Sequence, residues 1–127
     1  MPLMSEPRVD ARVRIEVPVQ VVETGSHATQ IEMRTLDLSC AGALCRAPAH
    51  IPLKSQIRIR IGITDDPQEP AILTDAVVLR LEKDQQTGAV AGSFLVALYF
   101  LNLRLVDRQR LQRFVFSQLA REGQAPS

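Results

Sequence analysis

Residues 12–22 read RVRIEVPVQVV, a stretch in which apolar and polar side chains alternate. Every second residue from Val13 to Val21 is apolar, and the residues between them are polar or proline. A period of two with β-branched residues predicts a half-buried β-strand. Because Pro18 has no N–H to donate to a ladder, we expect this strand to lie at a sheet edge, or Pro18 to lie at a bulge.

Five further segments have strand-like patterns, and turn-forming residues separate them. The clearest is 56–63, where isoleucine occupies every second position. Strands at short intervals joined by turns are typical of closed or nearly closed barrels. The 127 residues are enough for one domain with a core that needs no disulfide or metal. The further strands are predicted at 29–38, 43–47, 56–63, 71–83 and 89–102.

From Val106 onward the apolar period becomes helical. Asp107 suits the positive end of a helix dipole, and Gly123 is a suitable stop. We therefore expect a mainly β fold, a six-stranded antiparallel barrel with a C-terminal α-helix that covers one opening. The apolar helix face comprises Leu111, Phe114, Val115 and Leu119, and other faces hold Arg108, Arg110 and Arg113.

Composition and charge argue against several functional classes. The net charge is +1, whereas proteins that bind nucleic acid without sequence preference usually have a clear positive excess. The longest apolar run, 89–101, has 13 residues, and a membrane span needs about 20. The first residues lack the basic and then apolar pattern of a signal peptide, so we expect a cytoplasmic protein without a membrane span.

Cysteine and histidine are too sparse for a recognisable metal or catalytic centre. The chain has two cysteines, Cys40 and Cys45, and two histidines, His27 and His50. A zinc site needs four ligands with paired spacing, which these residues do not have, so we expect no metal. Neither histidine has an acid or a nucleophile at a suitable spacing, so we expect no enzymatic activity and no cofactor.

Two short patterns have the chemistry of a binding site. RVDAR at 8–12 contains two arginines, whose planar guanidinium groups donate paired hydrogen bonds to guanine edges and phosphates. DLSCAG at 37–42 places a carboxylate, a hydroxyl and a glycine on a turn, where they can accept from a guanine and allow close backbone approach. Together they predict a receptor for a guanine nucleotide with more than one phosphate. The candidate ligand-binding residues are Arg8, Arg12, Asp37, Ser39 and Gly42.

These motifs, with the late segment YFLN at 99–102 and the helix after it, resemble a PilZ domain. The resemblance implies a PilZ-type barrel that binds the bacterial second messenger cyclic di-GMP (c-di-GMP). It implies that the arginine pair contacts guanine and phosphate oxygens, and that the 37–42 motif holds the other side of the nucleotide. Many family members have a second arginine where this chain has Val9. Some also stack a tryptophan on guanine, and in this chain, which has none, an arginine plane would replace it.

From this resemblance we expect a PilZ domain at 8–121, between a flexible segment at 1–7 and a disordered tail at 122–127. Ligand binding would order the N-terminal arginine segment and signal to an effector protein, with the chain a monomer or weak homodimer. The alternative is an adaptor of the same fold that binds no nucleotide. Phe94, Phe100 and Phe114 are expected to pack the barrel and anchor the helix. Phe116, off the apolar helix face, is a hypothetical partner or dimer contact.

Overall fold

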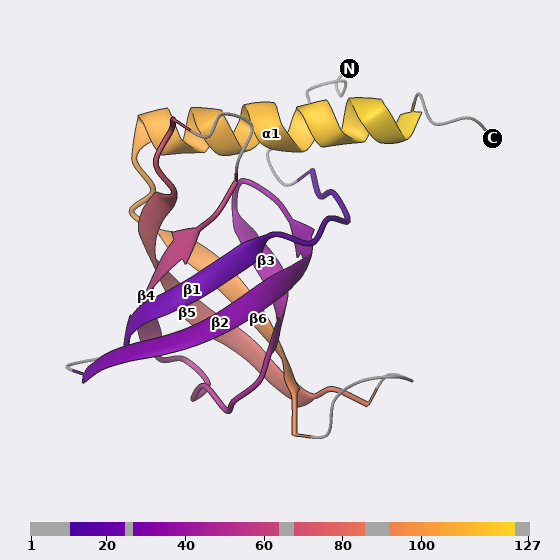
Figure 1. The fold of residues 1–127 in the computed structure, drawn as a ribbon. Coiled ribbons are helices and arrows are strands. Elements are labelled where there is room, and N and C mark those ends of the chain that lie inside the picture. The colour runs from indigo at the N-terminus through magenta and orange to yellow at the C-terminus, as the bar shows by residue number, and fades with distance from the viewer. Residues whose placement is uncertain (1–10, 25–26, 64–67, 86–91, 124–127) are drawn as a thin grey trace, which may run out of the picture.

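The computed structural model of the chain describes residues 11–24, 27–63, 68–85 and 92–123. Six antiparallel strands form a closed barrel, and one helix lies across its opening (Figure 1). The predicted fold class is therefore confirmed. The elements are β1 (Pro18–Thr24), β2 (His27–Leu38), β3 (Gly42–Ala47), β4 (Gln56–Ile61), β5 (Ile72–Lys83), β6 (Phe94–Leu101) and α1 (Leu105–Gly123).

The strand order around the barrel is β1-β2-β3-β6-β5-β4, which closes on itself and leaves no strand at an edge. The expectation of an edge strand or a bulge at Pro18 is therefore wrong. Pro18 is the first residue of β1, where a missing N–H breaks no ladder, and its carbonyl accepts a hydrogen bond from Gly62 N at 2.9 Å.

The alternation in 12–22 correctly predicts which side chains face the core, although the regular strand is shorter than predicted. Val13, Val17, Val19 and Val21 are buried. Val13 lies outside β1 and makes only a two-bond bridge to Leu38, with N–O distances of 3.0 and 2.9 Å. The bridge holds the start of the described chain against the end of β2.

Thr35 of β2 attaches the segment between this bridge and β1. Its hydroxyl accepts a hydrogen bond from Val17 N at 2.8 Å and donates one to the carbonyl of Ile15. Thr35 N also donates to the carbonyl of Val17 at 3.0 Å. Residues 11–17 therefore follow the outer end of β2 closely, although they are not a regular strand.

Helix α1 packs its predicted apolar face on the barrel opening, with Leu111, Phe114 and Val115 buried. Arg110, predicted to lie on another face of the helix, is nevertheless largely buried. Its side chain is only 9% exposed, and its Nε lies 3.0 Å from Glu69 Oε2 in the β4–β5 connection. A long side chain can cover the helix base while its charge is paired, which periodicity alone does not reveal.

The predictions for the other three phenylalanines have different outcomes. Phe100 is buried, whereas Phe94 is half-buried and makes an edge-to-face contact with His50, with ring centroids 5.5 Å apart. Phe116 is half-buried against the core. That burial weakens the case for Phe116 as a partner contact.

The structure describes the two ends of the chain only in part. Residues 1–7, predicted to be flexible, lie outside the described residues, as does most of the predicted tail. Glu122 and Gly123, expected in the tail, belong to α1. Within the described residues no helix is both long and apolar enough to cross a membrane.

Candidate functional site

The turn between β2 and β3 is organised by Ser39. Its hydroxyl accepts hydrogen bonds from Ala41 N and Gly42 N, each at 3.1 Å, and lies 3.2 Å from the Gly42 carbonyl, to which it donates. Ser39 N donates to the same carbonyl at 2.9 Å. Ser39 is fully buried, so its hydroxyl holds the turn from inside the protein and is not exposed to solvent.

Gly42 allows the backbones of β3 and β6 to come unusually close. A Cβ added at this position would lie 2.1 Å from the Leu98 carbonyl oxygen. Any side chain would therefore push the two strands apart. The glycine of the motif is required for this contact between strands.

A bulge in β2 turns Asp37 outward. Thr35 pairs with Cys45 and Asp37 pairs with Leu44, so Leu36 is one residue more than β3 matches. Strict alternation would point Asp37 into the core beside the buried Thr35. The extra residue instead puts the carboxylate on the outer face, with a quarter of its side chain exposed.

Arg12 and Asp37 meet at this outer face, although they are 25 positions apart in the chain. Arg12 Nη1 lies 2.5 Å from Asp37 Oδ1, in an ion pair with hydrogen-bond geometry. Half of the Arg12 side chain is exposed. The Val13–Leu38 bridge, one residue from each partner, fixes this encounter.

Arg12, Asp37 and Gly42 line one groove of about 370 Å³ on the outer wall of the barrel. The structure thus brings together three of the five predicted site residues. Ser39 lies beneath them in the turn, and Arg8 lies outside the described residues. The other lining residues are Ala41, Ala43, Leu44, Leu79, Arg80, Ala97, Leu98 and Tyr99.

Leu79, Arg80 and Tyr99 were not among the predicted site residues. A usable signal was present for Arg80. In the alternating pattern that starts at Ile72, position 80 falls on the inward face, where an arginine is out of place. A charge at an inward position predicts a bulge, and the same reasoning applies to Asp37 in β2.

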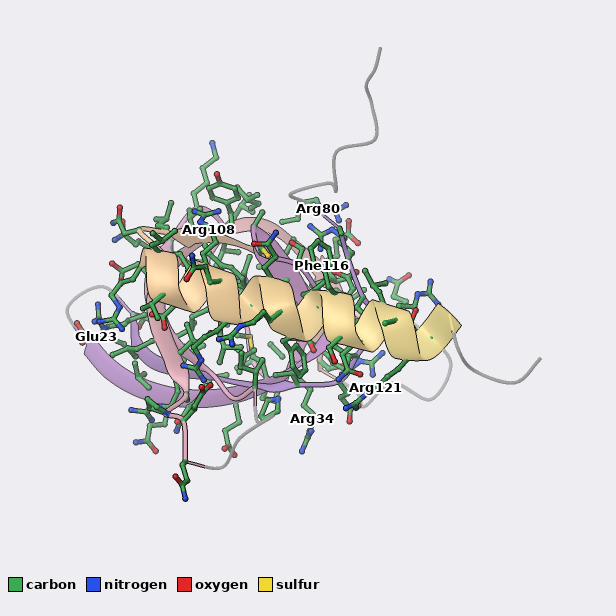
Figure 2. All side chains as sticks on the ribbon, turned by 90° about the horizontal axis from the view of Figure 1, so that it is seen from above. Glu23, Arg34, Arg80, Arg108, Phe116 and Arg121 are labelled. Carbon is green, nitrogen blue, oxygen red and sulfur yellow. The ribbon has the colours of Figure 1, made fainter. Side chains whose placement is uncertain are left out.

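Arg108 of α1 lies close enough to the Ser39–Gly42 turn for its charge to act on Cys40. Burial raises the pKa of the Cys40 thiol, and the positive charge of Arg108 partly offsets that rise. Arg104 instead pairs with Asp107 at 3.2 Å, beside a separate cavity of about 430 Å³. Seen along the barrel, Arg108 and Arg80 lie on one side of α1 and Arg34 on the other (Figure 2).

Cys45 lies beneath the groove and is chemically quiet. Burial raises the pKa of its thiol to about 12, and the negative charge of Asp37 adds to the rise. A thiol that stays protonated is a poor nucleophile and a poor metal ligand. Both cysteines are buried and unpaired in a disulfide.

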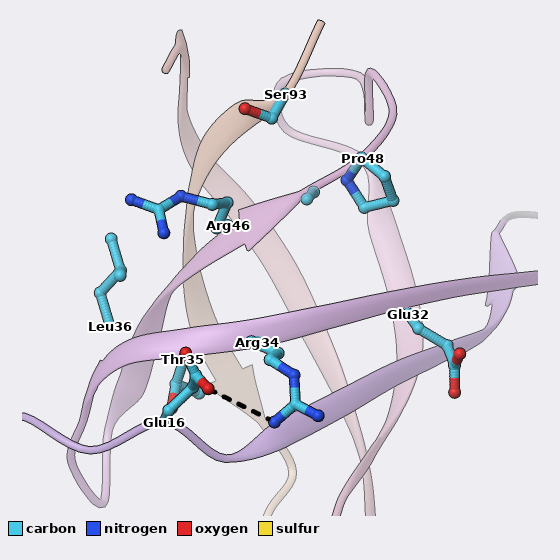
Figure 3. A pocket seen from close by; sticks show the side chains of 9 residues that line it. Glu16, Glu32, Arg34, Thr35, Leu36, Arg46, Pro48 and Ser93 are labelled. Atoms are coloured by element: carbon cyan, nitrogen blue, oxygen red, sulfur yellow. Dashed lines mark ion pairs between the residues drawn. The ribbon is translucent and has the colours of Figure 1, made fainter. Parts of the chain in front are cut away.

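A third hollow, of about 280 Å³, opens near the middle of β2 (Figure 3). Its charged groups largely compensate one another. Arg34 Nη1 lies 3.6 Å from Glu16 Oε1, and Arg46 Nε lies 2.5 Å from Asp84 Oδ2. With both arginines paired, this hollow has less capacity for an anionic ligand than the groove has.

The sequence model of the PilZ domain matches residues 4–117, which include both motifs and all six strands. The chain belongs to the PilZ domain family. Among curated proteins, no sequence matches this PilZ domain.

Solved structures share the fold of this PilZ domain. The PilZ domain of Escherichia coli YcgR with c-di-GMP is 18% identical, has a TM-score of 0.65, and the match covers 92% of this chain and 95% of that one. The Bacillus subtilis inhibitor of motility MotI/DgrA is 17% identical with a TM-score of 0.73, covering 91% and 52%. YcgR in complex with c-di-GMP is 20% identical with a TM-score of 0.66, covering 92% and 47%. The chain therefore spans about half the length of the latter two.

Proposed function

We propose that this PilZ domain is a bacterial, cytoplasmic receptor for c-di-GMP. The observation on which the proposal depends is the meeting of Arg12 and Asp37 on a groove beside the Gly42 turn. A carboxylate accepts from the N1–H and N2–H of guanine, and a guanidinium donates to phosphate or to guanine O6 and N7. The likeness to a PilZ domain with bound c-di-GMP supports this choice of ligand.

Binding would exchange the Arg12–Asp37 ion pair for contacts to the ligand. Guanine N–H groups would replace Arg12 as donors to the Asp37 carboxylate, and a phosphate would replace Asp37 as the acceptor for Arg12, so neither side chain would lose its hydrogen bonds. Arg8, four residues before Arg12 in the chain, would add a second guanidinium. Ser39 would act indirectly, by holding the turn, and Gly42 by keeping it close to β6.

The proposed output is a change of surface rather than a reaction. Ligand contacts to Arg8 and Arg12 would order the N-terminal segment, and an effector protein would recognise the ordered state. The proposal assigns the chain no catalytic role and no cofactor.

Isothermal titration calorimetry with c-di-GMP tests the proposal. We expect Arg12→Ala and Asp37→Ala each to cost about 1.5–3 kcal/mol of binding free energy, or roughly ten- to a hundredfold in affinity. Arg34→Ala is the matched control, because Arg34 also forms a surface ion pair, with Glu16 at the 280 Å³ hollow. Absence of binding heat from the folded wild-type protein at high micromolar concentration would defeat the proposal.

The alternative is a PilZ-fold adaptor that binds proteins and no nucleotide. Two observations favour it: Arg12 and Asp37 already satisfy each other, and the Ser39 hydroxyl is used within its turn. On this alternative both motifs are structural. Amide NMR spectra unchanged by c-di-GMP, together with a stable complex with a protein partner, would establish it over the receptor.

A further inference from the structure

A second bulge, in β5, faces the same groove as the bulge that exposes Asp37. Val78 pairs with Leu98 and Arg80 pairs with Ala97, so Leu79 is extra. As a result two consecutive residues point outward: Leu79 is 55% exposed, and Arg80 is exposed as well. Bulges commonly re-aim side chains beside functional sites.

The two bulges place Asp37 and Arg80 at opposite ends of one row across four strands. Asp37 pairs with Leu44, Leu44 with Ala97, and Ala97 with Arg80. Three strand spacings of about 4.8 Å put their Cα atoms about 14 Å apart. The floor between them is made of Leu44 and the small Ala97, and both line the groove.

The charge in the groove is unevenly compensated. Arg12 and Asp37 neutralise each other, whereas Arg80 has no hydrogen bond or ion pair to any residue that the structure describes. Tyr99, which is 47% exposed, stands beside the row and offers an aromatic surface. The groove thus has a carboxylate at one end, a guanidinium without a described partner at the other and an aromatic side wall.

We infer that Arg80 is a further ligand-binding residue, which holds a phosphate of a dinucleotide lying across Leu44 and Ala97. The inference rests on the proposed function. A guanine held at Asp37 directs its ribose and phosphate along the row toward β5, where the Arg80 fork can donate two hydrogen bonds to phosphate oxygens. A guanine base alone is too short to occupy both ends of the row.

Calorimetry of Arg80→Ala with c-di-GMP tests this inference. We expect the affinity to fall roughly ten- to a hundredfold, as for a lost charge-assisted hydrogen bond. Arg80→Lys keeps the positive charge but not the planar guanidinium that donates two parallel hydrogen bonds, so we expect an intermediate loss of affinity. Arg60→Ala is the matched control, because Arg60 is an exposed arginine of β4 that donates to Gln20 at 3.0 Å, away from the groove.

A steric variant and a spectroscopic signal test the floor independently. Ala97→Leu would fill the space between Asp37 and Arg80 and should weaken binding without reducing stability. Tyr99 is the only tyrosine of a chain without tryptophan, so its fluorescence reports on the groove alone. We expect c-di-GMP to change that emission and to shift the amide NMR signals of Arg80 and Ala97.

The outcomes separate the inference from the proposed function. If wild type, Arg80→Ala and Ala97→Leu all bind c-di-GMP equally well, the receptor proposal stands and the assignment of Arg80 is wrong. Unshifted Arg80 and Ala97 amides in a saturated wild-type sample would overturn the assignment of Arg80 without any variant. If the wild-type protein gives no heat, both are wrong.

Discussion

At Gly42 the contact between β3 and β6 leaves no space for even a methyl group. We expect Gly42→Ala to lower the free energy of unfolding by about 3 kcal/mol, because the new Cβ meets a backbone oxygen that cannot move alone. Gly62→Ala is the control, since its Cβ would lie 3.0 Å from the Pro18 ring, which can shift. Chemical denaturation compares the two variants, and an equal or smaller loss for Gly42→Ala would contradict this account.

Cys45 makes stability depend on alkaline pH. The folded protein holds the thiol proton more tightly than the unfolded chain, because its pKa rises from 9.0 to about 12. The stabilising contribution is therefore fully present below about pH 9 and is lost progressively as the pH rises from there toward about 12. Denaturation of wild type and Cys45→Ala between pH 8 and about 10.5 should show the steeper fall in wild type. Parallel curves would contradict the prediction.

At the scale of elements, Thr35 determines how residues 11–17 lie along β2. We expect Thr35→Val to cost about 1–3 kcal/mol, because the buried Val17 N–H loses its acceptor. Amide exchange at Val17 should speed up, and c-di-GMP affinity should fall, because Arg12 is positioned through this segment. Thr74→Val is the control: its hydroxyl donates to the Leu101 carbonyl at 2.8 Å, so stability should fall without faster exchange at Val17.

Period-two and helical patterns were sufficient to locate six strands and one helix, and they gave the inward faces of the regular stretches, because burial imposes the same period wherever a strand has no bulge. They failed where a contact between distant residues decides the outcome. Closure of the barrel gives β1, which begins at Pro18, a neighbouring strand on each side. The ion pair with Glu69 leaves Arg110 largely buried although it lies off the apolar helix face. Asp37 was predictable as a site residue from its motif, whereas Arg80 belongs to no motif, and the sequence signals only that a charge falls at an inward position of β5.

At the scale of the whole molecule, α1 and the barrel share one core. Leu111 is fully buried at their contact, so we expect Leu111→Ala to cost about 2–5 kcal/mol. Helical circular dichroism and Tyr99 fluorescence should report the same transition, one from the helix and one from the barrel wall. Leu105→Ala is the control, because Leu105 is 70% exposed. Separate midpoints for the two probes would show that the helix is an independent unit.

The interior of the closed barrel is filled by its own side chains, so the groove lies on the outer wall. A molecule bound there keeps one side turned to solvent and becomes part of the exterior of the protein. An effector could then touch messenger and protein together, and would distinguish the loaded from the empty state even if no strand moved.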